Sequence, residues 1–362
     1  MSMKHLSEYR DKELARKLIA AIRVRSKRPV RLMEICGTHT VAIFRHGIRQ
    51  VLPATIQLIS GPGCPVCVTA TEEIDRAIKL AGYPEVMVTT FGDLIRVPGS
   101  HSSLQQERAM GADVRLVYSS FDALKLAQEN PKKKVVFLAI GFETTAPTIA
   151  AAVLEARRSG LENFFILSAH KLLPPALEAL LSSGTLNIQG FIYPGHVTTV
   201  IGTSAYEAVA QEYKIPGVVC GFEPVDILET ILLLVSQIEQ DQVRVEIQYK
   251  RGVTAEGNPK ARAVLNQVFV PCDAPWRGLG LIPGSGLTLR PEYRTLAAED
   301  QFDLHVPPAQ DHPGCACGEV LLGVKTPPEC KLFRTVCRPD SPIGPCMVST
   351  EGTCAAYYKY QE

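Results

Sequence analysis

Cysteine is the residue type whose placement in this chain most directly indicates chemistry. Three of its eleven cysteines, Cys36, Cys64 and Cys67, lie near the start, and two more, Cys220 and Cys272, are isolated. The remaining six crowd the end of the chain, at Cys315, Cys317, Cys330, Cys337, Cys346 and Cys354. In a reducing compartment, grouped cysteines typically bind metal or carry out thiol redox chemistry. The sequence therefore predicts such sites at both ends of the chain.

Cys36 ends an apolar segment, residues 31–35, and is followed by Gly-Thr-His-Thr. A helix that begins near Thr38 would direct backbone N–H groups at the sulfur and favour the thiolate. Thiolate is the form that binds soft, low-spin iron(II). The alternative is a buried cysteine that acts as a small apolar side chain. The glycine and the polar neighbours favour the metal-binding interpretation.

Cys64 and Cys67 form a Cys-x-x-Cys in a loop stiffened by two prolines. This spacing suits two ligands of one metal ion or a reversible dithiol–disulfide pair. The same two cysteines, together with Cys36 and His39, could instead form a structural zinc site with three sulfur ligands and one nitrogen ligand. Both interpretations stay open at this point.

The six cysteines within residues 315–354 are the strongest signal in the sequence. Four thiolates satisfy a [4Fe–4S] cube, which leaves two cysteines over. A Cys-x-Cys cannot easily place both sulfurs on one small cluster, so one of Cys315 and Cys317 is a candidate for the spare pair. A zinc site or a tail crosslinked by disulfides are the alternatives.

Among the histidines, His196 is the best placed for a ligand, a proton carrier or a positioning group, because it follows Pro-Gly after an apolar segment. His39, Thr40 and Glu143 are candidate supporting residues. Glu143 and Glu223 both belong to a Gly-Phe-Glu, where a carboxylate could simply cap the helix that follows. For Glu223 we favour the capping role.

The elements that would position these side chains alternate between strands and helices. Strands are predicted at residues 31–35, 56–59, 86–90, 114–118, 135–140, 164–167, 191–193 and 218–219, and helices at 11–26, 72–80, 146–158, 175–181, 203–212 and 224–238. This alternation indicates an α/β fold with parallel sheets. Five polar motifs follow predicted strands, at residues 36–40, 61–67, 91–93, 141–145 and 194–196. Ligands of parallel sheets bind beyond the carboxyl ends of the strands, so the five loops could converge on one cleft.

A faint repeat and a change of composition divide the chain. Strand, Gly-Phe-Glu and helix follow one another at residues 135–155 and again at 215–234. The sequence thus predicts two similar parallel-sheet α/β lobes around a cleft, approximately residues 1–130 and 131–240, and leaves open an exchange of segments between them. Residues 241–362 would form a small cysteine-rich iron–sulfur domain held together by its cofactor.

The overall charge excludes some functional classes. The chain has 38 basic and 37 acidic side chains and a formal net charge of +1, without the basic excess of a nucleic-acid-binding protein. No apolar segment is long enough for a membrane span, and the first residues do not have the pattern of a signal peptide. We therefore expect a cytoplasmic protein that binds neither nucleic acid nor membrane.

The motifs CGTHT, GPGCPVC, GFETTAPT, YPGHV and CMVSTEGTC, in this order, resemble those of the HypD family of hydrogenase maturation factors. The resemblance covers nearly the whole chain. It implies two similar α/β domains followed by a [4Fe–4S] domain. It also implies a scaffold for assembly of the Fe(CN)₂CO unit of [NiFe]-hydrogenase. The implied partners are the chaperone HypC, the cyanide donor HypE and, indirectly, the hydrogenase large subunit.

The resemblance also implies roles for individual residues. Cys36 would bind the iron that carries cyanide and carbon monoxide, and Cys64 and Cys67 would form an assisting dithiol. The tail is similar to that of ferredoxin:thioredoxin reductase, which implies cluster ligation by Cys315, Cys330, Cys337 and Cys354 and a redox pair of Cys317 and Cys346. Two other functions are compatible with the same cysteines. They are an iron–sulfur thiol–disulfide oxidoreductase and a zinc-stabilised binding module.

Overall fold

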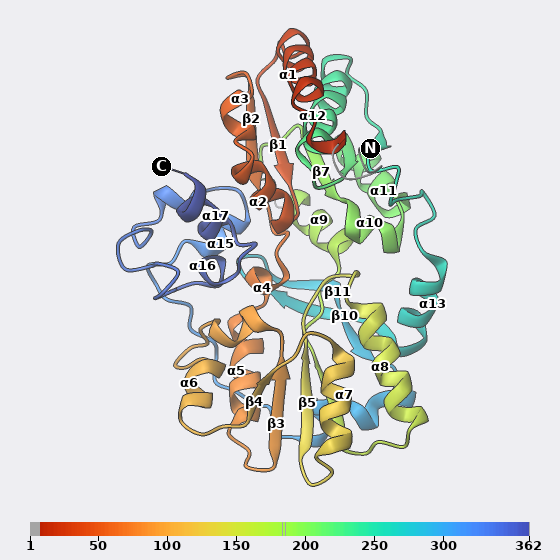
Figure 1. Ribbon diagram of the computed structural model, residues 1–362, viewed down its shortest axis with the longest axis vertical. Coiled ribbons are helices and arrows are strands. Elements are labelled where there is room, and N and C mark those ends of the chain that lie inside the picture. The colour runs from red at the N-terminus through yellow and green to blue at the C-terminus, as the bar shows by residue number, and fades with distance from the viewer. Residues whose placement is uncertain (1–7, 183, 185, 362) are drawn as a thin grey trace.

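The computed structural model describes residues 8–182, 184 and 186–361, and it contains two parallel sheets and one hairpin (Figure 1). The first sheet has the order β2-β1-β7-β8-β9, with β1 Val30–Glu34, β2 Ile56–Ser60, β7 Gly190–Pro194, β8 Gly217–Cys220 and β9 Val245–Ile247. The second has the order β4-β3-β5-β6, with β3 Val86–Thr90, β4 Val114–Leu116, β5 Lys134–Ala139 and β6 Phe164–Ser168. The predicted α/β fold with parallel sheets is confirmed.

Helices connect the strands of each sheet. Those before residue 190 are α1 Lys12–Arg25, α2 Gly37–Arg45, α3 Ile48–Val51, α4 Pro65–Val68, α5 Thr71–Ala81, α6 Leu104–Ala109, α7 Ser120–Glu129, α8 Ala146–Arg158 and α9 Leu173–Ser182. Those that follow are α10 Gly195–Ile201, α11 Ser204–Tyr213, α12 Pro224–Glu239, α13 Pro259–Val268, α14 Ala298–Gln301, α15 Cys317–Leu321, α16 Pro345–Val348 and α17 Thr353–Tyr360. Short 3₁₀ turns lie at η1 Glu8–Arg10, η2 Gly92–Arg96, η3 Pro291–Leu296 and η4 Pro327–Glu329.

The first sheet takes its strands from distant parts of the chain. After β2 the chain leaves this sheet, builds the second sheet from β3 to β6, and returns at β7, which pairs with the free edge of β1. Gly190 lies opposite Leu32 in this pairing, where a Cβ would lie 3.1 Å from Leu32 Cδ2 and 3.2 Å from Leu234 Cδ2, so glycine spares these two side chains a small shift. The strands therefore do not sort by the expected ranges 1–130 and 131–240. The strand order shows that segments of the chain are exchanged between the two sheets, which the predicted ranges had left open.

Both sheets repeat one strand order. Counted along the chain within each sheet, the first four strands lie in the order 2-1-3-4, which is the doubly wound order with a switch point beside the first strand. Each Gly-Phe-Glu follows a strand and precedes a helix, between β5 and α8 and between β8 and α12. However, β5 is the third strand of its sheet and β8 is the fourth, so the two motifs occupy positions that are not equivalent.

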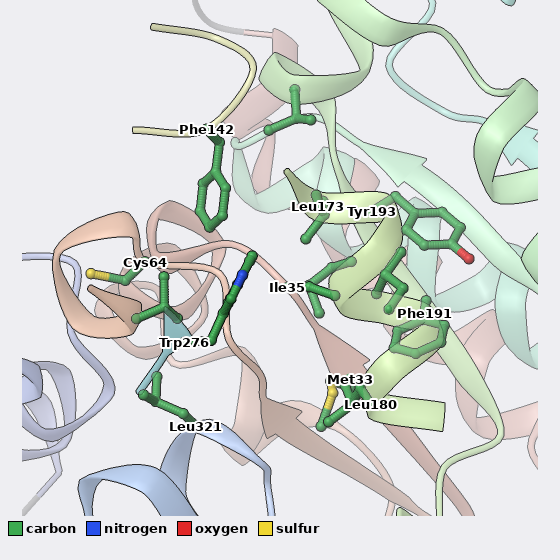
Figure 2. Packing of buried hydrophobic residues seen from close by; sticks show 14 of the residues in the cluster. Met33, Ile35, Cys64, Phe142, Leu173, Leu180, Phe191, Tyr193, Trp276 and Leu321 are labelled. Carbon is green, nitrogen blue, oxygen red and sulfur yellow. The ribbon is translucent and has the colours of Figure 1, made fainter. Parts of the chain in front are cut away.

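A β-hairpin that the sequence did not predict lies between the two sheets (Figure 1). It consists of β10 Phe269–Trp276 and β11 Gly280–Leu289, with a bulge between Cys272 and Ala274. Trp276 is 2% exposed and donates its indole N–H to Ser285 Oγ at 2.8 Å. Figure 2 shows this indole in one apolar cluster with Phe142, Cys64 and Leu321. The hairpin thus fills the space between the sheets and the cysteine-rich tail.

The tail after residue 303 is mostly irregular and lies beside the junction of the two sheets (Figure 1). Its helix α17 packs on α2, where the rings of Phe44 and Tyr357 lie 4.5 Å apart. Its helix α16 packs on α4. Among residues 8–182, 184 and 186–361, no helix combines the length and the apolar composition needed to cross a membrane.

Replacement of Trp276 tests the role of the hairpin. We expect Trp276→Ala to lower the free energy of unfolding by about 3–5 kcal/mol, because it leaves a cavity among side chains from both sheets and the tail. Chemical denaturation of the full chain measures this change. Leu281→Ala is the matched control on the same hairpin, since Leu281 is 67% exposed, and it should change stability by less than about 0.5 kcal/mol. Similar effects of the two substitutions would contradict this role of the hairpin.

Candidate functional site

Cys36 lies at the carboxyl end of β1 and is the residue immediately before α2. The loop that carries Cys64 packs directly on its backbone, since Gly37 N donates to Gly63 O at 3.1 Å. A Cβ at Gly63 would lie 2.1 Å from Cys36 N, so only glycine allows this approach. The first two cysteine motifs therefore form one compact structure at the ends of the neighbouring strands β1 and β2.

His196 is the histidine that faces Cys36. It lies in the first turn of α10, directly after β7, and its Nδ1 is 4.0 Å from Cys36 Sγ. His39 points elsewhere, because its Nε2 is 2.9 Å from Gly221 O and its ring stacks on Phe222 at 4.8 Å. Phe222 also contacts His196 at 5.3 Å. His196 thus lies next to Cys36, whereas the His39 ring lies against Phe222 and Gly221.

Burial dominates the electrostatics of this site. It raises the pKa of the Cys36 thiol to about 12, although backbone N–H groups at the start of α2 act in the opposite direction. The Glu351 carboxylate nearby raises this pKa further. Burial also lowers the pKa of His39 and of His196 to about 4, so both imidazoles are neutral at pH 7. The expected preference for thiolate is thus outweighed by burial unless a positive charge lies at the sulfur.

Cys64 is the residue immediately before α4, and Cys67 lies on the single turn of this helix. Their sulfur atoms are 2.6 Å apart, and Cys67 N lies 3.3 Å from Cys64 Sγ. Cys64 Sγ also lies 3.4 Å from Ser349 Oγ in the tail. Burial raises the pKa of Cys67 well above its usual value, and its thiol interacts with that of Cys346. The Cys-x-x-Cys therefore meets the tail cysteines directly.

All six tail cysteines line one small cavity. Cys317 Sγ and Cys346 Sγ lie 2.8 Å apart. The remaining wall is apolar and includes Val320, Leu332, Phe333 and Met347. Gly344 leaves room beside one sulfur, because a Cβ there would lie 2.7 Å from Cys315 Sγ. Four sulfurs around an apolar space, with a close pair at its side, fit a [4Fe–4S] cluster, whose ligands each bind a different iron.

A site for a single metal ion is not assembled in the described part of the chain. No group of three or more histidine, cysteine, aspartate or glutamate side chains there could hold one ion. One nitrogen of His39, a candidate ligand of the alternative zinc site, is already engaged, because its Nε2 lies 2.9 Å from Gly221 O. The cysteines are instead arranged as close pairs and as the wall of the tail cavity.

The five loops expected at one cleft divide into two groups. The three that follow β1, β2 and β7 meet at Cys36. The loop after β3 instead holds the tail, since Asp93 Oδ2 accepts from Thr350 N at 3.1 Å and lies 3.2 Å from Thr350 Oγ1. Glu143, after β5, accepts from Leu173 N at 2.9 Å and thus caps α9. The sequence had suggested a cap of the helix that directly follows Glu143, which is α8.

Two acidic residues at the site were missed by the sequence analysis. Glu34 is buried at the end of β1, where its Oε1 accepts from Thr40 Oγ1 at 2.8 Å, and burial raises its pKa to about 8. Glu351 accepts from Thr38 Oγ1 at 2.7 Å and thereby joins the tail to the Cys36 loop. A charged residue inside an apolar strand was the available signal for Glu34. For Glu351 the signal was its place between the last two cysteines.

The fold and this arrangement define a class of protein, an α/β scaffold with a thiol site at its junction and a cysteine cavity in its tail. The chain matches the HypD family model, described as "Hydrogenase formation hypA family", over residues 13–361. It is 50% identical over 368 residues to hydrogenase maturation factor HypD of Rhizobium leguminosarum bv. viciae, covering 99% of this chain and 96% of that protein. It is 46% identical to HypD of Escherichia coli K12, covering 99% of each chain. The chain therefore belongs to the HypD family of hydrogenase maturation factors.

The buried Glu143 carboxyl predicts a pH dependence of stability. Burial raises its pKa from 4.5 to about 7, so its contribution is fully present below pH 4.5 and is lost as the pH rises through 7. Glu143→Gln has no carboxyl group to ionise at this position, so it should not lose stability as the pH rises. Relative to wild type, the variant should therefore gain on the order of 3 kcal/mol in the free energy of unfolding between pH 5 and pH 8.

Urea denaturation across this pH range measures the difference. Glu162→Gln, at an exposed position in the same half of the chain, is the matched control and should track wild type at every pH. A constant difference between Glu143→Gln and wild type from pH 5 to pH 8 would show that Glu143 has an ordinary pKa.

Proposed function

We propose that this protein is a cytoplasmic scaffold on which the Fe(CN)₂CO unit of [NiFe]-hydrogenase is assembled. The observation that carries the proposal is the buried Cys36 thiol at the junction of three loops, with His196 Nδ1 4.0 Å away. A thiolate there would bind the iron as cargo and supply the electron density that cyanide and carbon monoxide ligands require. Iron would also supply the positive charge that a thiolate needs at this buried position.

His196 suits a proton-handling role at Cys36. It is neutral at pH 7, because burial lowers its pKa to about 4, and its Nδ1 faces the sulfur. A neutral imidazole can accept a hydrogen bond from the thiol and so orient its proton before Cys36 binds iron. His39, Thr40 and Glu34 hold the surrounding loop through their hydrogen bonds. Glu143 supports the site from the other sheet by capping α9.

The tail would hold a resident [4Fe–4S] cluster through Cys315, Cys330, Cys337 and Cys354, all in the wall of the tail cavity. When bound, the cluster supplies one-electron chemistry beside the close pair of Cys317 and Cys346. The partition into four ligands and one pair is supported by the 2.8 Å separation of that pair.

The close pairs also suit thiol–disulfide exchange. If Cys64 and Cys67 are joined as a disulfide, the Cys346 thiolate can attack Cys67 Sγ, form a Cys346–Cys67 bond and release Cys64 as a thiolate. Attack of the Cys317 thiolate on Cys346 then releases Cys67. The Cys64–Cys67 pair gains two electrons, the Cys317–Cys346 pair loses them, and the dithiol beside Cys36 is restored.

The proposed partners are a HypC-type chaperone that shares the iron, a HypE-type cyanide donor and, indirectly, the hydrogenase large subunit. A second candidate function is an iron–sulfur thiol–disulfide oxidoreductase, which the two close sulfur pairs favour. Reduction of a partner disulfide by the purified protein at catalytic rates would support this second function. A zinc-stabilised binding module is the third candidate, and metal analysis of anaerobically purified protein distinguishes it.

The iron-binding role of Cys36 is tested by Cys36→Ala in protein purified anaerobically with its HypC-type partner. We expect the infrared bands of iron-bound CO and CN to disappear while the visible absorption of the cluster remains. Cys272→Ala is the matched control, since Cys272 lies on the hairpin, and it should keep both signals. Bands of wild-type intensity in Cys36→Ala would overturn the assignment.

The partition of the tail cysteines is tested by single alanine variants with iron and sulfide quantified per chain. Cys315→Ala, Cys330→Ala, Cys337→Ala and Cys354→Ala should each lose most of the iron and sulfide, because each removes a cluster ligand. Cys317→Ala and Cys346→Ala should retain both. A cluster that survives Cys315→Ala but not Cys317→Ala would reverse the roles of these two neighbours.

A further inference from the structure

A second, polar cavity of about 290 Å³ lies between the edge of the first sheet and the tail. Arg31, Arg49 and Gln57 contribute to its wall from the sheet side, and Lys325, Thr326 and Thr353 from the tail side. β2 is the edge strand of its sheet, and the tail covers it here. None of these residues takes part in the proposed iron chemistry.

The Arg31 side chain lines this cavity, and within the described residues its Nε finds no acceptor. It lies on β1 directly beside Gln57 of β2 in the parallel register. Its Nε is buried and has no hydrogen-bond partner within the described residues, and none of them forms an ion pair with its guanidinium. An arginine that is partly buried in this way normally binds a carboxylate or another oxyanion.

Arg49, on α3, presents its free donors at the same cavity. Its guanidinium stacks 4.6 Å from the ring of Phe44 and 5.5 Å from that of Tyr357, so its faces are occupied. Its Nη1 donates to Leu58 O at 2.7 Å, whereas Nε and Nη2 are buried and have no partner among the described residues. Nε and Nη2 lie along one edge of the planar group, which is the geometry for bidentate binding of an oxyanion.

The carboxyl groups near this cavity, in the part of the chain that the structure describes, form no ion pair with Arg31 or Arg49. The Glu329 carboxylate in its wall is occupied, because it accepts from Thr326 N and Thr326 Oγ1 at 2.7 Å each. Glu319 is paired with Lys325 at 2.7 Å. Glu34 interacts electrostatically with Arg49, but burial raises the pKa of this carboxyl to about 8, so that it is mostly uncharged at pH 7. Its Oε1 accepts from Thr40 Oγ1, and its Oε2 is buried without a hydrogen-bond partner among the described residues. Buried guanidinium N–H groups without an acceptor cost free energy, which favours the binding of an anion that supplies acceptor oxygens.

We propose that this cavity binds a small oxyanion, a phosphate or carboxylate group, between the guanidinium groups of Arg31 on β1 and Arg49 on α3 and the ammonium group of Lys325 on the tail. The cavity exceeds the size of inorganic phosphate and has room for a small organic substituent. Bound there, the oxyanion bridges the first sheet and the tail. This proposal is independent of the iron chemistry, because the cavity residues and the cysteines are different.

Isothermal titration of the full chain tests the site, with inorganic phosphate or malonate added at constant ionic strength in chloride buffer. We expect saturable binding of one anion per chain and a rise of the melting temperature with anion concentration. Arg31→Gln removes one set of charge-assisted hydrogen bonds and should weaken binding about tenfold or more. Arg262→Gln, an exposed arginine on α13, is the matched control and should bind as wild type.

The two anions distinguish a tetrahedral phosphate group from a planar carboxylate, and binding of either supports the site. Arg31→Gln should keep the wild-type melting temperature in chloride alone, which separates loss of the ligand from loss of the fold. Absence of saturable binding of both anions to wild type would overturn the proposal, since the arginines would then be satisfied by water and Glu34. Equal affinity of Arg31→Gln and wild type would overturn it as well.

Discussion

The structure depends on the packing of α4, a single helical turn, between both sheets and the tail. Cys64, immediately before this turn, and Cys67 on it are buried in the cluster that includes Trp276 of the hairpin and Cys346 of the tail. Sulfur is small and tolerates apolar surroundings, so thiols can occupy such a place where carboxylates or amines would need counter-charges. Because thiols are buried here, the junction of the two sheets and the tail also contains groups that can bind metal or exchange disulfides.

This burial constrains the chemistry in a second way. A buried thiol holds its proton, as the raised pKa values of Cys36 and Cys67 show. These thiols therefore stay protonated until a bound metal ion, or exchange with a neighbouring disulfide, favours the thiolate. The hydrogen bond from Thr38 to Glu351 keeps the tail on the Cys36 loop, and the hydrogen bond from Thr350 to Asp93 keeps it on the loop after β3. The two groups of cysteines are therefore held as one unit.

Much of the local structure could be predicted from the sequence. The predicted strand at 86–90 and helix at 146–158 coincide with β3 and α8, since the apolar spacing in both is regular. The hairpin was missed because Pro271 and Pro275 argue against strands, yet both prolines lie in β10 of a sheet with only two strands, where each strand has a free edge. Strand partners could not be predicted either, because the sequence of an apolar strand does not specify which strand it will pair with.

The same limit applies to the site. Motif order indicated that Cys36, Cys64, Cys67 and His196 belong together, because each follows a strand. It could not indicate that His39 turns to Gly221, since that depends on where Phe222 lies. Nor could it place Glu34 or Arg49, whose importance comes from what surrounds them after folding.

The excursion of the chain between β2 and β7 has a consequence for biosynthesis. The second sheet comes from one continuous stretch, residues 86–168, so its strands can pair as soon as they leave the ribosome. The first sheet cannot be completed until residue 247 has been made, because β1 and β2 await β7, β8 and β9. During that interval the edge of β1 is open to unwanted pairing. The strand that precedes Cys36 is thus a site at which the nascent protein is open to aggregation.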